Sequence, residues 1–252
     1  MHRVVSRDQW ITERQKLLAE EKEFTRRRDA LAEKRRALPW VRVDKRYEFD
    51  SAQGRVTLAD LFRDKSQLFV QHVMQGPDQP LQCVGCALGV DGLESLLPHL
   101  ENHDVSVVAI ARATMAELNA LRDRMAWKIP FYSSFGSDFN YDYGVSFRPE
   151  DLAAGRAWYN YGYCDPGIED ISGNSVFHKD ESGAIYHTYS NYSRGGEDFM
   201  AIYRILEATP RGRNENGPHF SLTDWARPHN MYGQGGEVAA NGRFTPPVSC
   251  CM

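Results

Sequence analysis

Apolar residues recur every seven positions along the first part of the chain, within an otherwise strongly charged segment. The members of this repeat are Trp10, Leu17, Phe24, Leu31 and Leu38. Their spacing predicts one long helix from about residue 7 to about residue 36, with a narrow apolar stripe. Ser6 and Gln9 have the spacing of a capping box at its start, and Pro39 follows its end. We expect an N-terminal helical arm over residues 1–38 that packs on the rest of the chain or on a second copy in a homodimer.

Beyond the arm, the apolar positions group into shorter runs that alternate between strand and helix patterns. Residues 47–50 and 55–58 flank a turn and predict a hairpin, which a short helix over residues 58–62 could follow. Residues 67–74 and 105–110 are apolar enough for central strands. The helix expected between them is kinked at Pro98, and Thr114 caps the next helix. The order strand, helix, strand, helix predicts a parallel pair of strands with a crossover.

The second half of the chain has fewer periodic segments. Residues 131–133 predict a short strand, and residues 136–173 have no clear period. Residues 175–179 and 184–189 flank turn residues and predict an antiparallel hairpin. Asp198 has the position of a cap for a last helix, and the segment after Pro210 is rich in Gly, Pro and Asn and largely mobile by expectation. We therefore expect an α/β protein with a mixed sheet flanked by helices over residues 39–210 and an irregular C-terminal extension over residues 211–252.

Composition narrows the classes of function. The chain has 252 residues, is 42% hydrophobic and 25% charged, and has a formal net charge of -4. It has no basic stripe interleaved with aromatic residues, so we expect no nucleic-acid partner. It has no run of about 18 apolar residues and no apolar signal-peptide core, so we expect a cytoplasmic protein without a membrane partner.

The cysteines indicate redox chemistry. Five cysteines in a chain of this length are too few for a disulfide scaffold. Cys83 and Cys86 follow a predicted strand and loop and stand at the start of a predicted helix, where the helix dipole and unpaired N–H groups favour a thiolate. Their spacing places the second sulfur within bonding reach of the first. We predict that Cys83 attacks a disulfide or related oxidised sulfur substrate, that Cys86 resolves the mixed disulfide, and that no cofactor is needed.

Two alternatives remain open at the level of the sequence. A zinc site lacks a second cysteine pair, but a copper(I) site could combine both cysteines with one histidine, so that the protein delivers or uses copper. The candidate histidines are His72, His178, His187 and His229. The other alternative is a dimeric interaction protein without catalysis. No role is predicted for the three remaining cysteines, which are Cys164, Cys250 and Cys251.

Several segments together resemble a bacterial family of thioredoxin-like proteins, catalogued as domain of unknown function 899 and described as predicted dithiol-disulfide oxidoreductases related to peroxiredoxins. They are the charged N-terminal helix, the cysteine pair after Gly76-Pro77, Ser175-Val176-Phe177, His187-Thr188-Tyr189-Ser190, Arg194-Gly195, the run from Pro210 to Glu215, and Asp224-Trp225 with His229. The resemblance implies a thioredoxin-like fold of the peroxiredoxin-related kind. The chemistry predicted for the cysteine pair also requires a reducing partner protein that restores the dithiol.

The segments that carry the resemblance also supply further site candidates. His187, Tyr189 and Arg194 are candidates for substrate binding. Two features depart from common redox motifs of this fold. Val84-Gly85 between the cysteines lacks a proline, and no proline directly precedes Ser175.

Overall fold

The computed structural model describes residues 2–79 and 82–247, and the chain divides into two units at Trp40 and Val41. The first unit is helix α1 (Arg7–Arg36). Ser6 caps it through the backbone N–H of Gln9, and the Gln9 side chain accepts a hydrogen bond from the Ser6 N–H, which confirms the predicted capping box. No side chain of this helix is buried. None of the described helices is long and apolar enough to cross a lipid bilayer.

The second unit is built on a mixed sheet, which in the described part of the chain has eight strands in the order β1-β11-β10-β4-β6-β7-β2-β3. The bounds of these strands are β1 (Val41–Arg42), β2 (Glu48–Ser51), β3 (Gly54–Thr57), β4 (Gln67–His72), β6 (Val105–Ala111), β7 (Phe131–Ser133), β10 (Gly173–Lys179) and β11 (Ile185–Tyr192). The two predicted hairpins are confirmed as β2–β3 and β10–β11.

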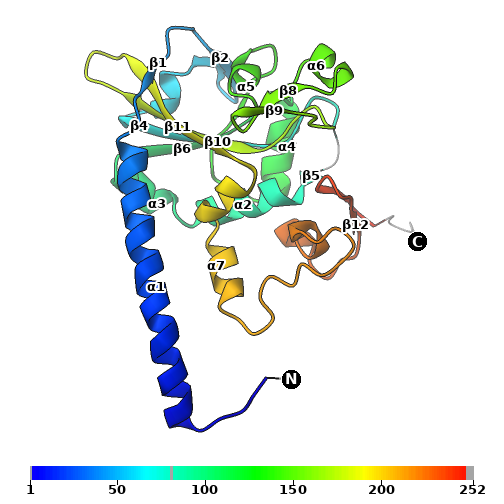
Figure 1. Cartoon of the computed structure of the whole chain (residues 1–252). Coiled ribbons are helices and arrows are strands. Elements are labelled where there is room, and N and C mark those ends of the chain that lie inside the picture. Colours follow the sequence, from blue (N-terminus) through cyan, green and yellow to red (C-terminus); the bar gives the residue numbers. More distant parts are fainter. Residues whose placement is uncertain (1, 80–81, 248–252) are drawn as a thin grey trace. The chain divides into compact units, whose positions relative to one another are not determined.

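Four adjacent strands, in the order β11-β10-β4-β6, have the connectivity of a thioredoxin fold (Figure 1). β4 and β6 are parallel and are joined by helices α2 (Val84–Glu94) and α3 (Leu97–Asn102). The β10–β11 hairpin adds to the other side of β4 in antiparallel register, and α7 (Ala201–Glu207) follows it. The fold is therefore the thioredoxin-like α/β fold with a mixed sheet that the sequence predicts.

The sheet is buried on both faces, because successive side chains of a strand point in opposite directions. Val107 and Ala109 of β6 belong to one apolar cluster, which contains α2 and helix α4 (Met115–Arg124). Val108 and Ile110 belong to the cluster on the opposite face, under the 3₁₀ helix η1 (Asp60–Phe62) and α5 (Phe139–Asp142). The same alternation decides which side chains of β4 can reach the cysteines.

Two predictions about helix boundaries are wrong. The helix expected to kink at Pro98 is instead two helices, α2 and α3, and Pro98 lies in the first turn of the second, where its missing N–H is tolerated. Asp198 does not cap the last helix. Residues Ser193–Phe199 form the 3₁₀ helix η2, α7 begins after Met200, and the Asp198 carboxylate pairs with Arg204 at 2.8 Å.

The segment without periodicity contains short elements. These are α5, α6 (Pro149–Ala153) and the pair β8 (Ala157–Tyr159) and β9 (Gly162–Cys164). A buried ion pair connects it to the sheet: the Arg112 guanidinium donates to both carboxylate oxygens of Asp170, at 2.7 and 2.8 Å. The Ser146 hydroxyl donates to the same carboxylate at 2.6 Å.

The C-terminal extension also contains regular structure. Its elements are η3 (Leu222–Asp224), η4 (His229–Met231), β12 (Glu237–Val238) and β13 (Arg243–Thr245). β13 pairs with β12 and with β5 (Gln82–Cys83), a short strand that the sequence pattern does not reveal. Through residue 247, this segment is therefore part of the fold, with short regular elements that the sequence pattern does not predict.

We predict that Asp170→Ala lowers the free energy of unfolding by about 3 kcal/mol, because the mostly buried Arg112 guanidinium then keeps only its longer contact, 3.4 Å, with the exposed Glu169. Glu101→Ala is the control: it breaks an exposed pair with Arg63 at 2.8 Å, whose loss costs about 0–1 kcal/mol. Urea denaturation of both variants measures the difference. Equal losses in the two variants would contradict a structural role for the buried pair.

Candidate active site

The cysteine pair stands at the start of α2, as the sequence predicts. Cys83 is the N-cap residue, with extended backbone angles, and its Sγ accepts a hydrogen bond from the backbone N–H of Cys86 at 3.3 Å. The first N–H groups of a helix have no partner within the helix, so a side-chain acceptor at the N-cap stabilises the helix start. Here the acceptor is a sulfur atom, and capping therefore places it in the positive field of the helix.

Both cysteines are free thiols, and both are buried. The thiol of Cys83 donates to Met74 Sδ at 3.6 Å, and the backbone N–H of Met74 donates to Cys86 Sγ at 3.3 Å. Met74 belongs to the segment that leaves β4, so the strand and the helix start hold the two sulfur atoms together from opposite sides.

The surroundings give the two thiols different acidities. A hydrogen bond from the Cys86 thiol, the backbone N–H of Cys86 and the positive charge of Arg243 outweigh the effect of burial and lower the pKa of Cys83 to about 7. The same hydrogen bond between the thiols and the burial of the site raise the pKa of Cys86 above its ordinary value. Cys83 is therefore the thiol that ionises first, and Cys86 keeps its proton.

The C-terminal extension covers Cys83. Arg243 of β13 lies opposite Cys83 of β5, and the carbonyl oxygen of Gly242 accepts a hydrogen bond from the Val84 N–H at 2.9 Å. The guanidinium of Arg243 donates to the carbonyl oxygen of Met74 and to Gln79 Oε1, the latter at 2.6 Å. Arg243 follows Met74 by 169 residues and Gln79 by 164 residues. A distant part of the chain thus fixes a positive charge beside the two sulfur atoms.

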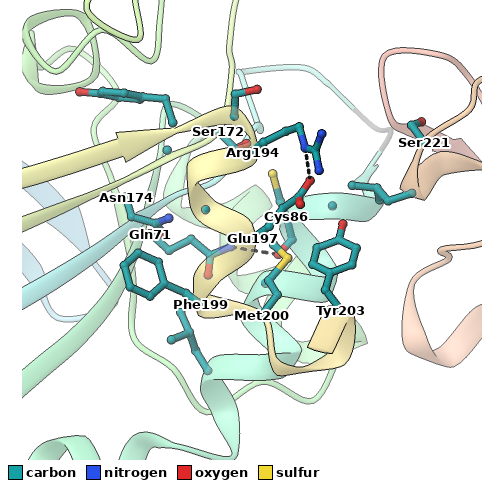
Figure 2. A pocket seen from close by; sticks show the side chains of 18 of the residues that line it. Gln71, Cys86, Ser172, Asn174, Arg194, Glu197, Phe199, Met200, Tyr203 and Ser221 are labelled. Atoms are coloured by element: carbon teal, nitrogen blue, oxygen red, sulfur yellow. Dashed lines mark hydrogen bonds and ion pairs between the residues drawn. The ribbon is translucent and has the colours of Figure 1, made fainter. Parts of the chain in front are cut away.

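A cavity of about 380 Å³ opens from the helix start (Figure 2). Its wall includes Phe69 and Gln71 of β4, Gly85 and Cys86 of α2, Ser172, Gly173 and Asn174 at the start of β10, Phe199, Met200 and Tyr203 around the start of α7, and Leu222 of η3. Cys86 therefore faces the cavity directly. Cys83 lies just behind Gly85, because a Cβ placed on Gly85 would be 3.9 Å from Cys83 Sγ.

The structure brings one of the three predicted substrate-binding residues to this cavity. Arg194 lies in its wall, and its Nε donates to Glu197 Oε1 at 3.3 Å (Figure 2). His187 instead packs against Tyr143 on the other side of the sheet, and its Nε2 is 2.7 Å from Ser190 Oγ. Tyr189 pairs with Val176 in the hairpin and is not a wall residue of the cavity.

The four candidate histidines of a copper site do not gather at the cysteines. Across residues 2–79 and 82–247, no three His, Cys, Asp or Glu side chains form a group that could hold a metal ion. His72 follows Gln71 in β4, so it points to the opposite face and packs on Phe139. His229 binds Asp91 at 2.7 Å, and His178 and His187 lie in the β10–β11 hairpin.

Of the remaining cysteines, Cys164 is exposed at the end of β9. Cys250 and Cys251 lie outside the described residues.

Sequence reasoning missed three residues of the site: Gln71, Tyr203 and Arg243. Gln71 is a polar residue within an apolar strand, which is a usable signal, since such residues are buried only with a partner. Its side-chain N–H donates to the carbonyl oxygen of Cys86 at 3.1 Å. Tyr203 looks like an ordinary core residue of an amphipathic helix. Arg243 stands in a glycine-rich segment, and no local pattern connects it to Cys83.

We predict that alkylation of Cys83 by iodoacetamide rises with pH with a midpoint near 7, because the thiolate is the reactive form and the Cys83 pKa is about 7. Fragment-ion mass spectrometry of the peptide that contains both cysteines assigns the alkyl group to Cys83 or to Cys86. Arg243→Gln removes a charge that lowers this pKa and should move the midpoint to higher pH, by up to about one pH unit.

The matched control is Arg55→Gln, which removes an exposed arginine of β3 that pairs with Glu48 and Asp50. It should leave the midpoint unchanged. A midpoint at the free-cysteine value of about 8.5 in the unmodified chain would contradict the described environment of Cys83.

The chain was compared with curated proteins, with solved structures and with models of protein families. A search of curated proteins found no match. Solved structures that are similar include a cysteine-to-serine mutant of PrxQ from Xylella fastidiosa, at 10% identity and a TM-score of 0.39 over 63% of this chain and 88% of that one. The peroxidoxin BcpB from Mycobacterium tuberculosis matches at 12% identity and a TM-score of 0.40, over 64% and 94%. The mitochondrial 2-Cys peroxiredoxin from Plasmodium falciparum matches at 10% and 0.40, over 66% and 91%.

A family model covers most of the chain. It is described as "bacterial protein of unknown function (DUF899)", and it matches residues 1–232. This range contains both cysteines, η2 and α7, whereas Arg243 lies beyond it. The chain therefore belongs to this family, as the resemblance noted in its sequence implies.

Proposed function

We propose that this protein is a thiol–disulfide oxidoreductase in which Cys83 is the attacking thiolate and Cys86 the resolving thiol. One observation carries the proposal: the sulfur of Cys83 caps α2 and has a lowered pKa, while the neighbouring Cys86 keeps its proton. A stabilised thiolate is the nucleophile of disulfide exchange, and a thiol within reach of it can complete the exchange.

The reaction follows from these roles. The Cys83 thiolate attacks one sulfur of a substrate disulfide, forms a mixed disulfide and releases the first substrate thiolate, which takes a proton from solvent. Cys86 then attacks the Cys83 sulfur, releases the second substrate thiol and passes its own proton to it. The substrate gains two electrons, and the cysteine pair loses them and becomes a disulfide. A dithiol of a reducing partner protein restores the pair.

The cavity gives the substrate a path to the pair. It ends at Gly85 and Cys86, and the missing side chain at Gly85 leaves space between Leu222 and the Cys83 sulfur. We infer that a substrate sulfur enters here, because on the other side Gly242 and Arg243 lie against Cys83. No cofactor takes part in this reaction.

Trapping tests the proposal. We predict that Cys86→Ser, treated with a disulfide substrate, accumulates a mixed disulfide on Cys83, because the resolving thiol is missing. The matched variant Cys83→Ser should accumulate far less on Cys86. The hydrogen bond and charge of Cys83 are then gone, but burial still raises the pKa of the Cys86 thiol. Intact-mass and peptide analysis after acid quenching measure both adducts.

Three results would count against the proposal. One is the absence of any adduct on Cys83 in Cys86→Ser. Another is stoichiometric copper in protein purified without chelator, lost in Cys83→Ser, together with no disulfide turnover. A cysteine pair that can be replaced by serines without any change in activity or cellular phenotype would favour an interaction protein instead.

Gly85→Ala tests the path to Cys83. The added methyl group would lie 3.5 Å from Leu222 Cδ2 and 3.9 Å from Cys83 Sγ, which is ordinary van der Waals contact. Helix propensity then favours alanine by up to about 1 kcal/mol, so the variant should be at least as stable. Disulfide turnover should fall by about tenfold, because the methyl group displaces the approaching sulfur.

Gly92→Ala is the control, since it adds the same methyl group to the same helix with no atom within 4 Å. It should gain stability and keep turnover. Thermal denaturation and steady-state kinetics measure the two effects. Equal turnover in both variants would show that the substrate reaches Cys83 by another route.

A further inference from the structure

The cavity beyond the cysteines has the size of a small-molecule site. Its volume of about 380 Å³ lies within the range of about 300–1,000 Å³ that is usual for such sites. Phe69 and the side chains of Phe199 and Met200, which Figure 2 labels, form an apolar part of its wall. The occupant of this space could be a loop of a protein substrate or a small molecule. The polar groups of the wall indicate which of the two fits.

Two buried polar groups of the wall have no hydrogen-bond partner among the described residues. They are Gln71 Oε1 and the hydroxyl of Tyr203. The Gln71 side chain is 5% exposed and that of Tyr203 is 1% exposed. Buried polar groups normally have partners, and one that lacks a partner destabilises the fold unless a ligand supplies the missing bond.

The orientation of Gln71 is fixed by its neighbour. Its amide nitrogen donates to the carbonyl oxygen of Cys86, so the amide oxygen is left as an acceptor (Figure 2). Gly89 permits this contact, because a Cβ at that position would be only 2.6 Å from the Gln71 nitrogen. The wall therefore has a hydrogen-bond acceptor, Gln71 Oε1, beside Cys86, whose thiol faces the cavity.

Tyr203 is held in place from behind. The Arg213 guanidinium lies 4.1 Å from the centre of its ring, and Glu197 and Glu207 bind that guanidinium at 2.9 and 2.6 Å. The positive charge of Arg213 is thus matched by carboxylates. Arg194, the other arginine of the wall, pairs with Glu197 at 3.3 Å, so neither arginine is a free cation for a phosphate group. The two unsatisfied groups of the wall are neutral ones.

We propose that the cavity binds one arm of a low-molecular-weight thiol or disulfide that carries peptide amide groups. Gln71 Oε1 accepts an amide N–H of this arm, and the Tyr203 hydroxyl donates to a carbonyl oxygen. The apolar wall covers the methylene groups, and the sulfur of the arm lies at the end of the cavity formed by Gly85 and Cys86. This inference rests on the proposed function, and it names the substrate class of the same site.

The corresponding reaction balances with oxidised glutathione as the probe. The reduced cysteine pair and one molecule of oxidised glutathione give the Cys83–Cys86 disulfide and two molecules of glutathione. Two electrons pass from the pair to the glutathione disulfide, and both product thiols are protonated as described above. A protein dithiol returns the electrons.

Tyr203→Phe separates binding from structure. The variant removes only a hydroxyl without a described partner, so it should not lower the melting temperature. S-methylglutathione cannot exchange disulfides, and its affinity therefore reports the cavity alone. We expect Tyr203→Phe to weaken its binding about three- to tenfold, as measured by titration calorimetry.

Tyr232→Phe is the matched control, because its hydroxyl accepts a bond from the Arg227 N–H outside the cavity. It should bind S-methylglutathione like the unmodified chain. No binding to the unmodified chain, or equal affinity in all three proteins, would overturn the cavity proposal. Either result could still accompany trapping of a disulfide on Cys83, which would leave the oxidoreductase standing.

The opposite failure is also visible. Binding of S-methylglutathione that depends on Tyr203, without any adduct on Cys83 in Cys86→Ser, would support the ligand site and contradict the oxidoreductase. Insulin reduction tests whether the amide groups bound in the cavity belong to a protein substrate or to a small molecule. Turnover of insulin together with no use of oxidised glutathione would overturn the assignment to a small molecule, whereas a preference for oxidised glutathione that is reduced in Tyr203→Phe would support it.

Discussion

The hydrogen bond from the Cys86 N–H to the sulfur of Cys83 organises the site. It gives α2 its cap, fixes the first sulfur at the positive end of the helix and holds the second sulfur one turn away. The difference between the pKa values of Cys83 and Cys86 depends on this geometry. It makes the Cys83 sulfur the acceptor and the Cys86 thiol the donor of the hydrogen bond between them. The proposed division of roles between attacking and resolving cysteine is a consequence of helix capping.

The sheet supplies the other constraint. Alternation along β4 sends Gln71 toward the cysteines and His72 into the aromatic cluster on the opposite face. Of these two neighbouring residues, only one can face the cysteines. In the structure this residue is Gln71, through its side-chain amide. His72 thus lies away from the cysteine pair, and Gln71 contributes an amide beside it.

Local signals in the sequence predicted much of the fold. The capping box at Ser6, the cap at Thr114 and the turn between β10 and β11 each involve residues close in sequence, and all three are confirmed. The missed features depend on distant partners. β5 becomes a strand only because β13 pairs with it, and Arg243 reaches Cys83 only through that pairing. Asp198 shows the reverse error, since a good cap residue binds Arg204 instead.

The most direct measurement is the redox titration of the cysteine pair in glutathione buffers, followed by mass spectrometry of the peptide that contains both cysteines. An exchange-active pair predicts a two-electron transition to a form that has lost both thiol hydrogens, with the Cys83–Cys86 disulfide as the oxidised product. A peptide that remains reduced across the range, or that ends with glutathione attached and no internal disulfide, would contradict the proposed roles of the two cysteines.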